Sequence, residues 1–280
     1  MLLAGIAVFT ASFSLTACVD QHPDSTEGQS QADSVRLVAT SPAAAQICDK
    51  LELDLVGVCR TSGTLPERYK DVTQVGTAMS PDMEILKSLS PDYVLSPNSL
   101  QSDLQPKYAS IQVKSLFLNL KSVSGMYASI ADLGEKFNRQ QQAQAMVDEF
   151  NTFMQEYKNK NAGKEAPKVL ILMGLPGSYI VATENSYVGS LVEMAGGQNV
   201  YAGTDEETKE PDVILRASHA MPEQVQQMFA DEFEKNDIWK HFAAVQNGRV
   251  YDLDSSLFGM SANFSYQQAL EALQPMLYNN

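Results

Sequence analysis

The stretch EKFNRQQQAQAMVDEFNTFMQEYKNKNA, residues 135–162, contains neither proline nor glycine. In its second half, apolar residues recur every three or four positions, as at Val147, Phe150 and Met154. This spacing places them on one face of a helix whose other face is polar. A helix of about 20 residues spans ~30 Å, roughly the diameter of a small domain. We therefore predict that residues 122–164 form a bridging helical region whose long second helix braces two lobes.

On both sides of this region, strand-like runs alternate with helix-length segments. The runs cover residues 35–40, 55–59, 93–96 and 113–118 before it, and residues 168–173, 179–182, 213–216 and 249–253 after it. Such alternation is typical of α/β lobes with mainly parallel sheets. The sequence therefore predicts an α/β fold with an N-terminal lobe at 35–121 and a C-terminal lobe at 165–280.

Composition narrows the function classes. Among 280 residues, 34 acidic side chains outnumber 20 basic ones, and the formal net charge is -14. Binding to nucleic acid or to an anionic membrane surface requires clustered Lys and Arg, which this balance disfavours. Three histidines and three cysteines exclude a multi-histidine metal cage and a disulfide scaffold. We expect Cys48 and Cys59 to be buried free thiols, although export would permit a disulfide.

The N-terminus carries an export signal. Residues 1–17 are almost wholly apolar or small and end in LTAC at 15–18, which resembles a bacterial lipobox with Cys18 as the lipidated residue. Residues 1–18 are therefore predicted to be a lipoprotein signal peptide. The polar residues 19–34 lack apolar periodicity and are predicted to form a flexible tether. This arrangement would hold the protein by lipid at the outer face of the cell membrane.

Two turns hold candidate ligands, since open α/β sheets bind ligands where loops leave the carboxyl ends of strands. In GTAMSPD (76–82), Ser80 is expected to cap a helix that begins at Pro81, so Met79 projects from the preceding turn. In LRASHAMP (215–222), His219 occupies a similar turn. A thioether and an imidazole from opposite lobes can ligate haem iron axially. Taken alone, however, such a methionine is more often core packing and such a histidine more often structural.

At these residues the chain resembles a known family. The segments VGTAMSPDME (75–84), ILRASHAMP (214–222), NDIWK (236–240) and LFGMSA (257–262) resemble the haem-receptor lipoproteins of Gram-positive iron-regulated surface determinant systems. These are substrate-binding components of haem ABC importers. The resemblance implies a bilobal substrate-binding protein with two Rossmann-like lobes joined by a long rigid helix. It also implies haem as the transported ligand, with Met79 and His219 on its iron, and no enzymatic activity.

The same resemblance implies partners. Haem would pass from cell-wall haem-relay proteins to this receptor, a monomer, and then to an ABC permease with its ATPase. Acidic residues on the two lobes would dock on permease arginines. Glu84 matches the first-lobe position, and Glu207, with Glu206 as the alternative, is the candidate for the second.

Further residues are candidates for contact with the porphyrin. Arg60, Thr61, Ser62 and the helix start at Ser41 offer groups that suit propionates, although each is equally an ordinary βα turn. Apolar walls are expected from three residues for which core packing is the alternative: Tyr179, Phe258 and Met260.

The sequence alone leaves three other functions to consider. A divalent-metal receptor shares the fold but requires about four hard or imidazole ligands. A ferric-siderophore receptor also shares the fold and would bind without Met–His ligation. An exported α/β hydrolase would require a nucleophile motif such as GxSxG, which does not occur in this sequence.

Overall fold

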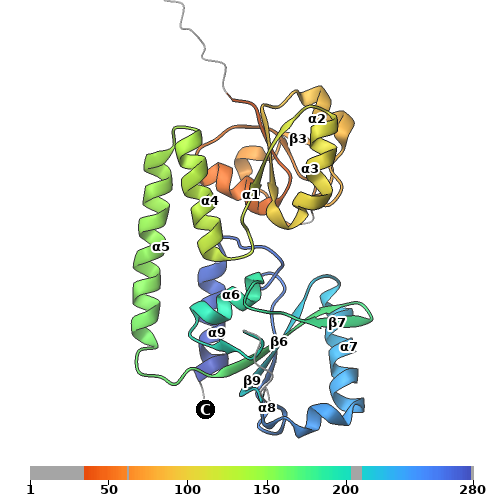
Figure 1. Cartoon of the computed structure of the whole chain (residues 1–280), viewed down its shortest axis with the longest axis vertical. Helices are drawn as coiled ribbons and strands as arrows, with labels where there is room; N and C mark the ends of the chain where they lie inside the picture. Colours follow the sequence, from red (N-terminus) through yellow and green to blue (C-terminus); the bar gives the residue numbers. More distant parts are fainter. Residues whose placement is uncertain (1–34, 62, 203–209, 279–280) are drawn as a thin grey trace, which may run out of the picture. The chain divides into compact units, whose positions relative to one another are not determined.

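The structure is a computed structural model that describes residues 35–61, 63–202 and 210–278. The predicted signal peptide, the tether and Cys18 lie outside these residues. Figure 1 shows two α/β lobes and, beside them, a pair of long helices.

The first lobe contains a five-stranded parallel sheet in the order β3-β2-β1-β4-β5. This matches the first five strands of the Rossmann order 3-2-1-4-5-6. Its strands are β1 (Leu37–Ala39), β2 (Leu55–Val58), β3 (Thr73–Gln74), β4 (Tyr93–Pro97) and β5 (Lys114–Leu118). Its helices are α1 (Pro42–Lys50), α2 (Met83–Leu89) and α3 (Gln101–Ser110), with 3-10 turns η1 (Glu67–Tyr69) and η2 (Asn98–Leu100).

The second lobe contains a mixed sheet in the order β10-β9-β6-β7, with β8 also paired to β6. Only β7 runs antiparallel to its neighbour among the described strands. The strands are β6 (Lys168–Leu175), β7 (Ser178–Val181), β8 (Gln198–Asn199), β9 (Val213–Ser218) and β10 (Val250–Asp252). The helices are α6 (Tyr187–Met194), α7 (Pro222–Lys235), η3 (Asp237–His241), α8 (Ala243–Gln246) and α9 (Tyr266–Tyr278).

Both sheets are covered on both faces, as parallel sheets require. In β1, Leu37 and Ala39 pack in one apolar cluster while Val38 between them packs in another. In β6, Ile171 and Leu172 likewise belong to different clusters. All eight predicted strands are confirmed, and the α/β class with them.

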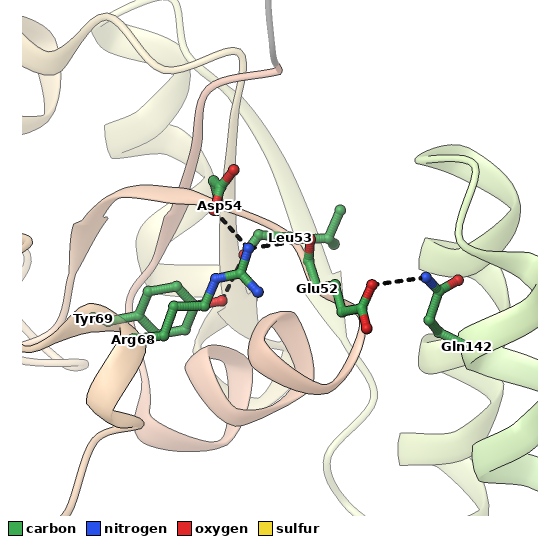
Figure 2. Close-up of polar contacts among 6 residues, drawn as sticks. All are labelled: Glu52, Leu53, Asp54, Arg68, Tyr69 and Gln142. Carbon is green, nitrogen blue, oxygen red and sulfur yellow. Dashed lines mark hydrogen bonds and ion pairs between the residues drawn. The ribbon is translucent and has the colours of Figure 1, made fainter.

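The bridging region consists of α4 (Val123–Lys136) and α5 (Gln140–Lys160), packed side by side. Near its start, α5 reaches the first lobe through Gln142, whose side-chain amide donates to the Glu52 carboxylate at 3.1 Å (Figure 2). Near its end, the Tyr157 hydroxyl donates to the Leu270 carbonyl on α9 at 2.7 Å. One helix therefore bonds to both lobes.

The turn of the first lobe that accepts from Gln142 is held in place by further hydrogen bonds. Arg68 donates to the Asp54 carboxylate at 2.6 Å, and the buried Tyr69 hydroxyl donates to the Leu53 carbonyl at 2.6 Å (Figure 2). Burial raises the pKa of Tyr69, so its hydroxyl remains a donor. The turn that carries Glu52 is thus fixed by two neighbours.

Aromatic rings join the bridging helices to the second lobe. The ring of Tyr127 on α4 stacks on Phe150 of α5 at 4.4 Å, and Tyr266 of α9 meets both rings edge-on. The Tyr127 and Tyr266 hydroxyls are hydrogen-bonded at 3.2 Å. Each aromatic pair adds about 0.5–1.5 kcal/mol beyond its buried area.

The two cysteines that the structure describes, Cys48 and Cys59, are free and buried, as expected. Burial raises the pKa of Cys48 to about 12 and that of Cys59 to about 11. Both thiols therefore remain protonated at neutral pH.

We expect Phe150→Ala to lower the free energy of unfolding by about 2–3 kcal/mol, because the half-buried ring stacks on Tyr127 and contacts Tyr266. Phe150→Leu, which retains apolar volume, should lose about half as much. Urea denaturation followed by circular dichroism measures both values. Equal stability of all three proteins would show that the ring does not stabilise the joint between the bridging helices and the second lobe.

Candidate functional site

Three predicted site residues follow neighbouring strands of the first sheet. Ser41 comes after β1, Arg60 after β2 and Met79 after β3, and these strands are adjacent and parallel. Carboxyl ends of parallel strands lie at the same sheet edge. The structure therefore brings these three turns to one edge of the first lobe.

The turn that carries Met79 is tightly closed. The Asp82 amide donates to the Val75 carbonyl at 2.7 Å, and Gly76 and Pro81 form a bridge between them. Gly76 has φ +91, and a Cβ there would lie 2.7 Å from the Ser80 carbonyl oxygen. Because this closed turn offers Met79 no packing partner, its side chain is 72% exposed.

The predicted first residue of the helix that follows this turn is wrong. We expected Ser80 as the cap and Pro81 as the first helical residue, but α2 begins at Met83. Its cap is Asp82, whose carboxylate accepts from the amides of Glu84 and Ile85 at 2.9 and 3.0 Å. The Gly76–Pro81 bridge holds Pro81 in the turn, and the helix can begin only after it.

A cavity of 330 Å³ lies beside this turn. It is lined by Arg60, Gln74, Gly76, Ser80, Pro81, Asp82 and Ile85. The amide of Arg60 donates to the Gly76 carbonyl at 2.7 Å, which joins the two turns directly. The Arg60 side chain is exposed and makes no ion pair with another described residue.

The other candidate propionate groups are already engaged. Ser41 is 5% exposed, and its hydroxyl caps α1 by accepting from the Ala44 amide at 3.2 Å. The Thr61 hydroxyl accepts from the Gly63 amide at 3.0 Å. Ser62 lies outside the described residues. Arg60 is thus the available cation at this edge.

In the second lobe, His219 directly follows β9 and is exposed. Its amide donates to the carbonyl of Gly174, the neighbouring position on β6, at 3.0 Å. Two residues later, Met221 has φ +47, a backbone conformation rare for a methionine, and α7 begins at Pro222 as expected. Within the described part of the chain, the imidazole makes no hydrogen bond, so both ring nitrogens remain available.

Three exposed apolar side chains lie in the second lobe. Met260 follows β10 and is 53% exposed, and Met221 is 53% exposed. On β7, Ile180 is 58% exposed. Sequence reasoning missed Ile180, although its alternation with Tyr179 on one strand was a usable signal.

The other two predicted wall residues lie deeper. Phe258 is 1% exposed and packs in the core. The half-buried Tyr179 packs against Phe229 and Trp239, with ring centroids 5.7 and 6.2 Å apart. Neither ring is exposed in the way the three residues above are.

The predicted docking acid Glu84 is exposed in the first turn of α2. The second candidate, Glu207, lies outside the described residues. The structure reveals a counterpart that the sequence did not suggest: Glu223, exposed in the first turn of α7. Glu84 and Glu223 each stand just after a candidate ligand turn.

Two further features lie away from these turns. A cavity of 640 Å³ is lined by residues of α4, α5 and α6 and of the loops before α4 and α6, and none of the predicted site residues lines it. Within the described ranges, no group of three or more His, Cys, Asp or Glu side chains could hold a metal ion. In the same ranges, no helix has the length and apolarity needed to cross a bilayer.

The chain belongs to the periplasmic binding protein family, whose model matches residues 37–257. It is 43% identical over 277 residues to the high-affinity heme uptake system protein IsdE of Staphylococcus aureus strain Newman, covering 95% of this chain and 94% of that protein. These two findings make it an IsdE-like substrate-binding protein of a transport system.

Two solved structures agree with this assignment. An ABC transporter substrate-binding protein from Listeria monocytogenes EGD-e superimposes with a TM-score of 0.83 at 44% identity, covering 88% of this chain and 100% of that one. S. aureus IsdE complexed with heme superimposes with a TM-score of 0.81 at 44% identity, covering 88% and 99%. The predicted family and bilobal substrate-binding fold are confirmed.

We expect Asp82→Ala to lower the free energy of unfolding by about 1 kcal/mol, because two α2 amides lose their acceptor. Asp82→Asn keeps a capping oxygen and should lose only a few tenths of that amount. Urea denaturation measures both. Indistinguishable losses in the two variants would contradict the capping role.

Proposed function

We propose that this protein is a haem receptor that captures haem outside the cell and delivers it to an ABC permease for iron acquisition. The observation that carries the proposal is the 43% identity to IsdE across 95% of the chain. The likeness to IsdE in complex with heme supports the same ligand. Haem is cargo here, and the protein performs no chemistry on it, so we assign no catalytic residue.

Met79 and His219 are the proposed iron ligands. Both are exposed and each belongs to a different lobe. A soft thioether and an imidazole without a hydrogen-bond partner among the described residues are free to coordinate iron. The imidazole is the stronger donor, so His219 should hold the cargo more firmly than Met79.

The surrounding residues suit the rest of the porphyrin. The exposed guanidinium of Arg60 is the proposed propionate partner, with Ser41, Thr61 and Ser62 as secondary candidates. Met260 is the proposed apolar wall, supported from behind by Tyr179 and Phe258. In addition, we assign Met221, two residues after His219, and Ile180 on β7 to this wall because both are exposed apolar side chains.

Location and partners follow from the same family. Residues 1–18 are proposed as the lipoprotein signal peptide, with Cys18 lipidated, and residues 19–34 as a tether. The receptor would stand as a monomer at the outer face of the cell membrane. There it would receive haem from cell-wall relay proteins and meet the permease and its ATPase.

The lobes are proposed to move little when cargo binds. Helix α5 bonds to the first lobe through Gln142 and to the second through Tyr157. A helix resists bending more than a loop hinge does. Residues 35–121 and 165–280 would therefore act as lobes on a rigid brace at 122–164.

The test of the function is hemin titration of the purified soluble protein, followed by absorption spectroscopy. We expect saturable binding with a low-spin spectrum. His219→Ala should reduce haem retention more than Met79→Ala, and each should shift the Soret band. Apolar contact contributes roughly 25 cal/mol per Å² buried, so only the double variant should abolish specific loading.

The matched control is His241→Ala, because this histidine is exposed at the end of η3 and follows no ligand turn. Its spectrum should equal that of the unmodified protein. An unchanged spectrum in His219→Ala would refute bilobal ligation, and a shift with Met260→Ala but not Met79→Ala would move the first-lobe ligand to Met260. Binding of a ferric siderophore or a divalent cation in place of hemin would favour the alternative receptors.

Glu207 remains a candidate for permease docking in the second lobe. We also propose Glu84 in the first lobe and Glu223 in the second. Their carboxylates stand at the starts of α2 and α7 and are exposed to a partner. Glu84→Lys and Glu223→Lys should each lower haem-stimulated ATPase activity of the reconstituted permease, by about tenfold for loss of a charged pair. Hemin binding should remain intact.

Glu156→Lys is the control for these charge reversals, because Glu156 is exposed on α5, away from both turns. It changes net charge by the same amount and should leave the ATPase stimulation unchanged. If all three variants weakened it equally, long-range charge would explain the effect and specific docking would not.

A further inference from the structure

Glu232, on α7, gathers three hydrogen bonds on one carboxylate oxygen. Its Oε1 accepts from the Tyr179 hydroxyl at 3.2 Å, from the Trp239 indole at 3.1 Å and from the Asn236 side-chain amide at 3.0 Å. The donors come from β7, from η3 and from the residue that ends α7. One carboxylate therefore ties three segments together.

Two of the donors to Glu232 belong to a cluster of aromatic side chains. Tyr179 packs on Phe229 and Trp239, and Trp239 stacks on Phe233 at 4.3 Å. Hydrogen bonds to an ionised carboxylate are stronger than those between neutral groups, so Glu232 holds the Tyr179 and Trp239 rings in place although it is itself only partly buried. The indole and amide donors lower the pKa of Glu232, so the group stays ionised at neutral pH.

Tyr179, which donates to this carboxylate, is connected to the His219 turn through paired residues on neighbouring strands. Tyr179 on β7 is paired with Gly174 on β6, and Gly174 is paired with Ser218 on β9. The carbonyl of Gly174 also accepts the hydrogen bond from the His219 amide. Tyr179 is therefore the direct strand partner of Gly174, the residue that holds the His219 backbone.

Helix α7 approaches the same glycine closely. A Cβ at Gly174 would lie 2.3 Å from Cγ1 of Val225 and 2.7 Å from the Phe229 ring, and both of these side chains are fully buried. The helix starts at Pro222, three residues after His219. Any shift of α7 on β6 must therefore move the His219 turn.

His219 depends on this backbone support. A metal-binding histidine usually donates its second ring N–H to a neighbour that fixes the ring orientation. The His219 imidazole has no such partner among the residues that the structure describes. Its orientation is consequently set by the turn and by the docking of α7.

We propose that Glu232 is a positioning residue for the haem ligand His219, which it holds in place by fixing α7 and the β6–β7 hairpin to each other beside Gly174. This inference rests on the proposed haem-binding function. Glu232 itself touches no ligand. It acts through Tyr179 and the helix start.

The first test compares Glu232→Ala, Glu232→Gln and Tyr179→Phe in the full soluble chain. Hemin-loaded proteins are examined for their low-spin fraction and for the rate of haem loss to excess apomyoglobin. Glu232→Ala should raise the loss rate by about tenfold and reduce the low-spin fraction, since charged hydrogen bonds are lost. Glu232→Gln keeps an acceptor oxygen and should restore most of the low-spin signal.

Tyr69→Phe is the control for Tyr179→Phe. Both changes remove one tyrosine hydroxyl that donates a hydrogen bond, but Tyr69 donates to Leu53 in the first lobe. Tyr179→Phe should accelerate haem loss by about threefold, while Tyr69→Phe should lower stability without altering the spectrum. Equal spectra for Tyr179→Phe, Glu232→Ala and the unmodified protein would overturn the proposal.

A second comparison separates positioning from general stability. Gly174→Ala and Gly197→Ala both force a Cβ into packed side chains of the second lobe, at 2.3 and 2.9 Å. Gly197 precedes β8, which pairs with β6 at its amino end, Lys168 and Val169. Only Gly174→Ala should change the haem spectrum; the same change in both would overturn the proposal.

These outcomes are distinct from failure of the proposed function. If the unmodified protein gives no saturable hemin spectrum, the receptor assignment and this inference fail together. If it binds hemin and His219→Ala alters the spectrum while all Glu232 variants retain it, only the positioning role of Glu232 is refuted.

Discussion

The aromatic contact among Tyr127, Phe150 and Tyr266 is the constraint on which the rest of the molecule depends. These rings come from α4, α5 and α9, and they join the bridging helices to the second lobe through a stacked pair and two edge contacts. The proposed iron ligands belong to different lobes. Their separation is therefore fixed by this joint and by the hydrogen bonds at the two ends of α5, and not by any direct contact between the ligands.

Within each lobe, the parallel sheet determines where a ligand can be presented. Loops leave β3 and β9 at the carboxyl edges, and backbone bonds to the adjacent strands hold them. In the first lobe, Gly76 permits the closed turn that exposes Met79. In the second, Met221 takes up the left-handed conformation and α7 supports the turn. Rare backbone conformations thus occur at both proposed ligand turns, where the surrounding structure enforces them.

The fold was largely predictable because its signals are local. Alternating strand and helix patterns identified eight strands, while β3 and β8 were missed because two-residue strands leave no periodic pattern. The start of α2 was misplaced because the Gly76–Pro81 bridge is a tertiary contact. The exposed ligand turns were visible in the sequence, but the choice of Met79 and His219 required the family resemblance. The support from Glu232 was not predictable, since Tyr179 lies 53 residues away along the chain.

The net charge of the whole chain and the charge beside the proposed site act differently on an anionic cargo. A formal net charge of -14 opposes the approach of a dianionic porphyrin at long range. At physiological ionic strength, however, such interactions are screened beyond about 8 Å. The exposed guanidinium of Arg60 stands beside the Met79 turn, where the local field outweighs distant carboxylates. An acidic receptor can therefore hold an anionic cargo where an unpaired cation such as Arg60 lies at the sheet edge, even though Asp82 lines the same cavity and Glu84 and Glu223 stand just after the proposed ligand turns.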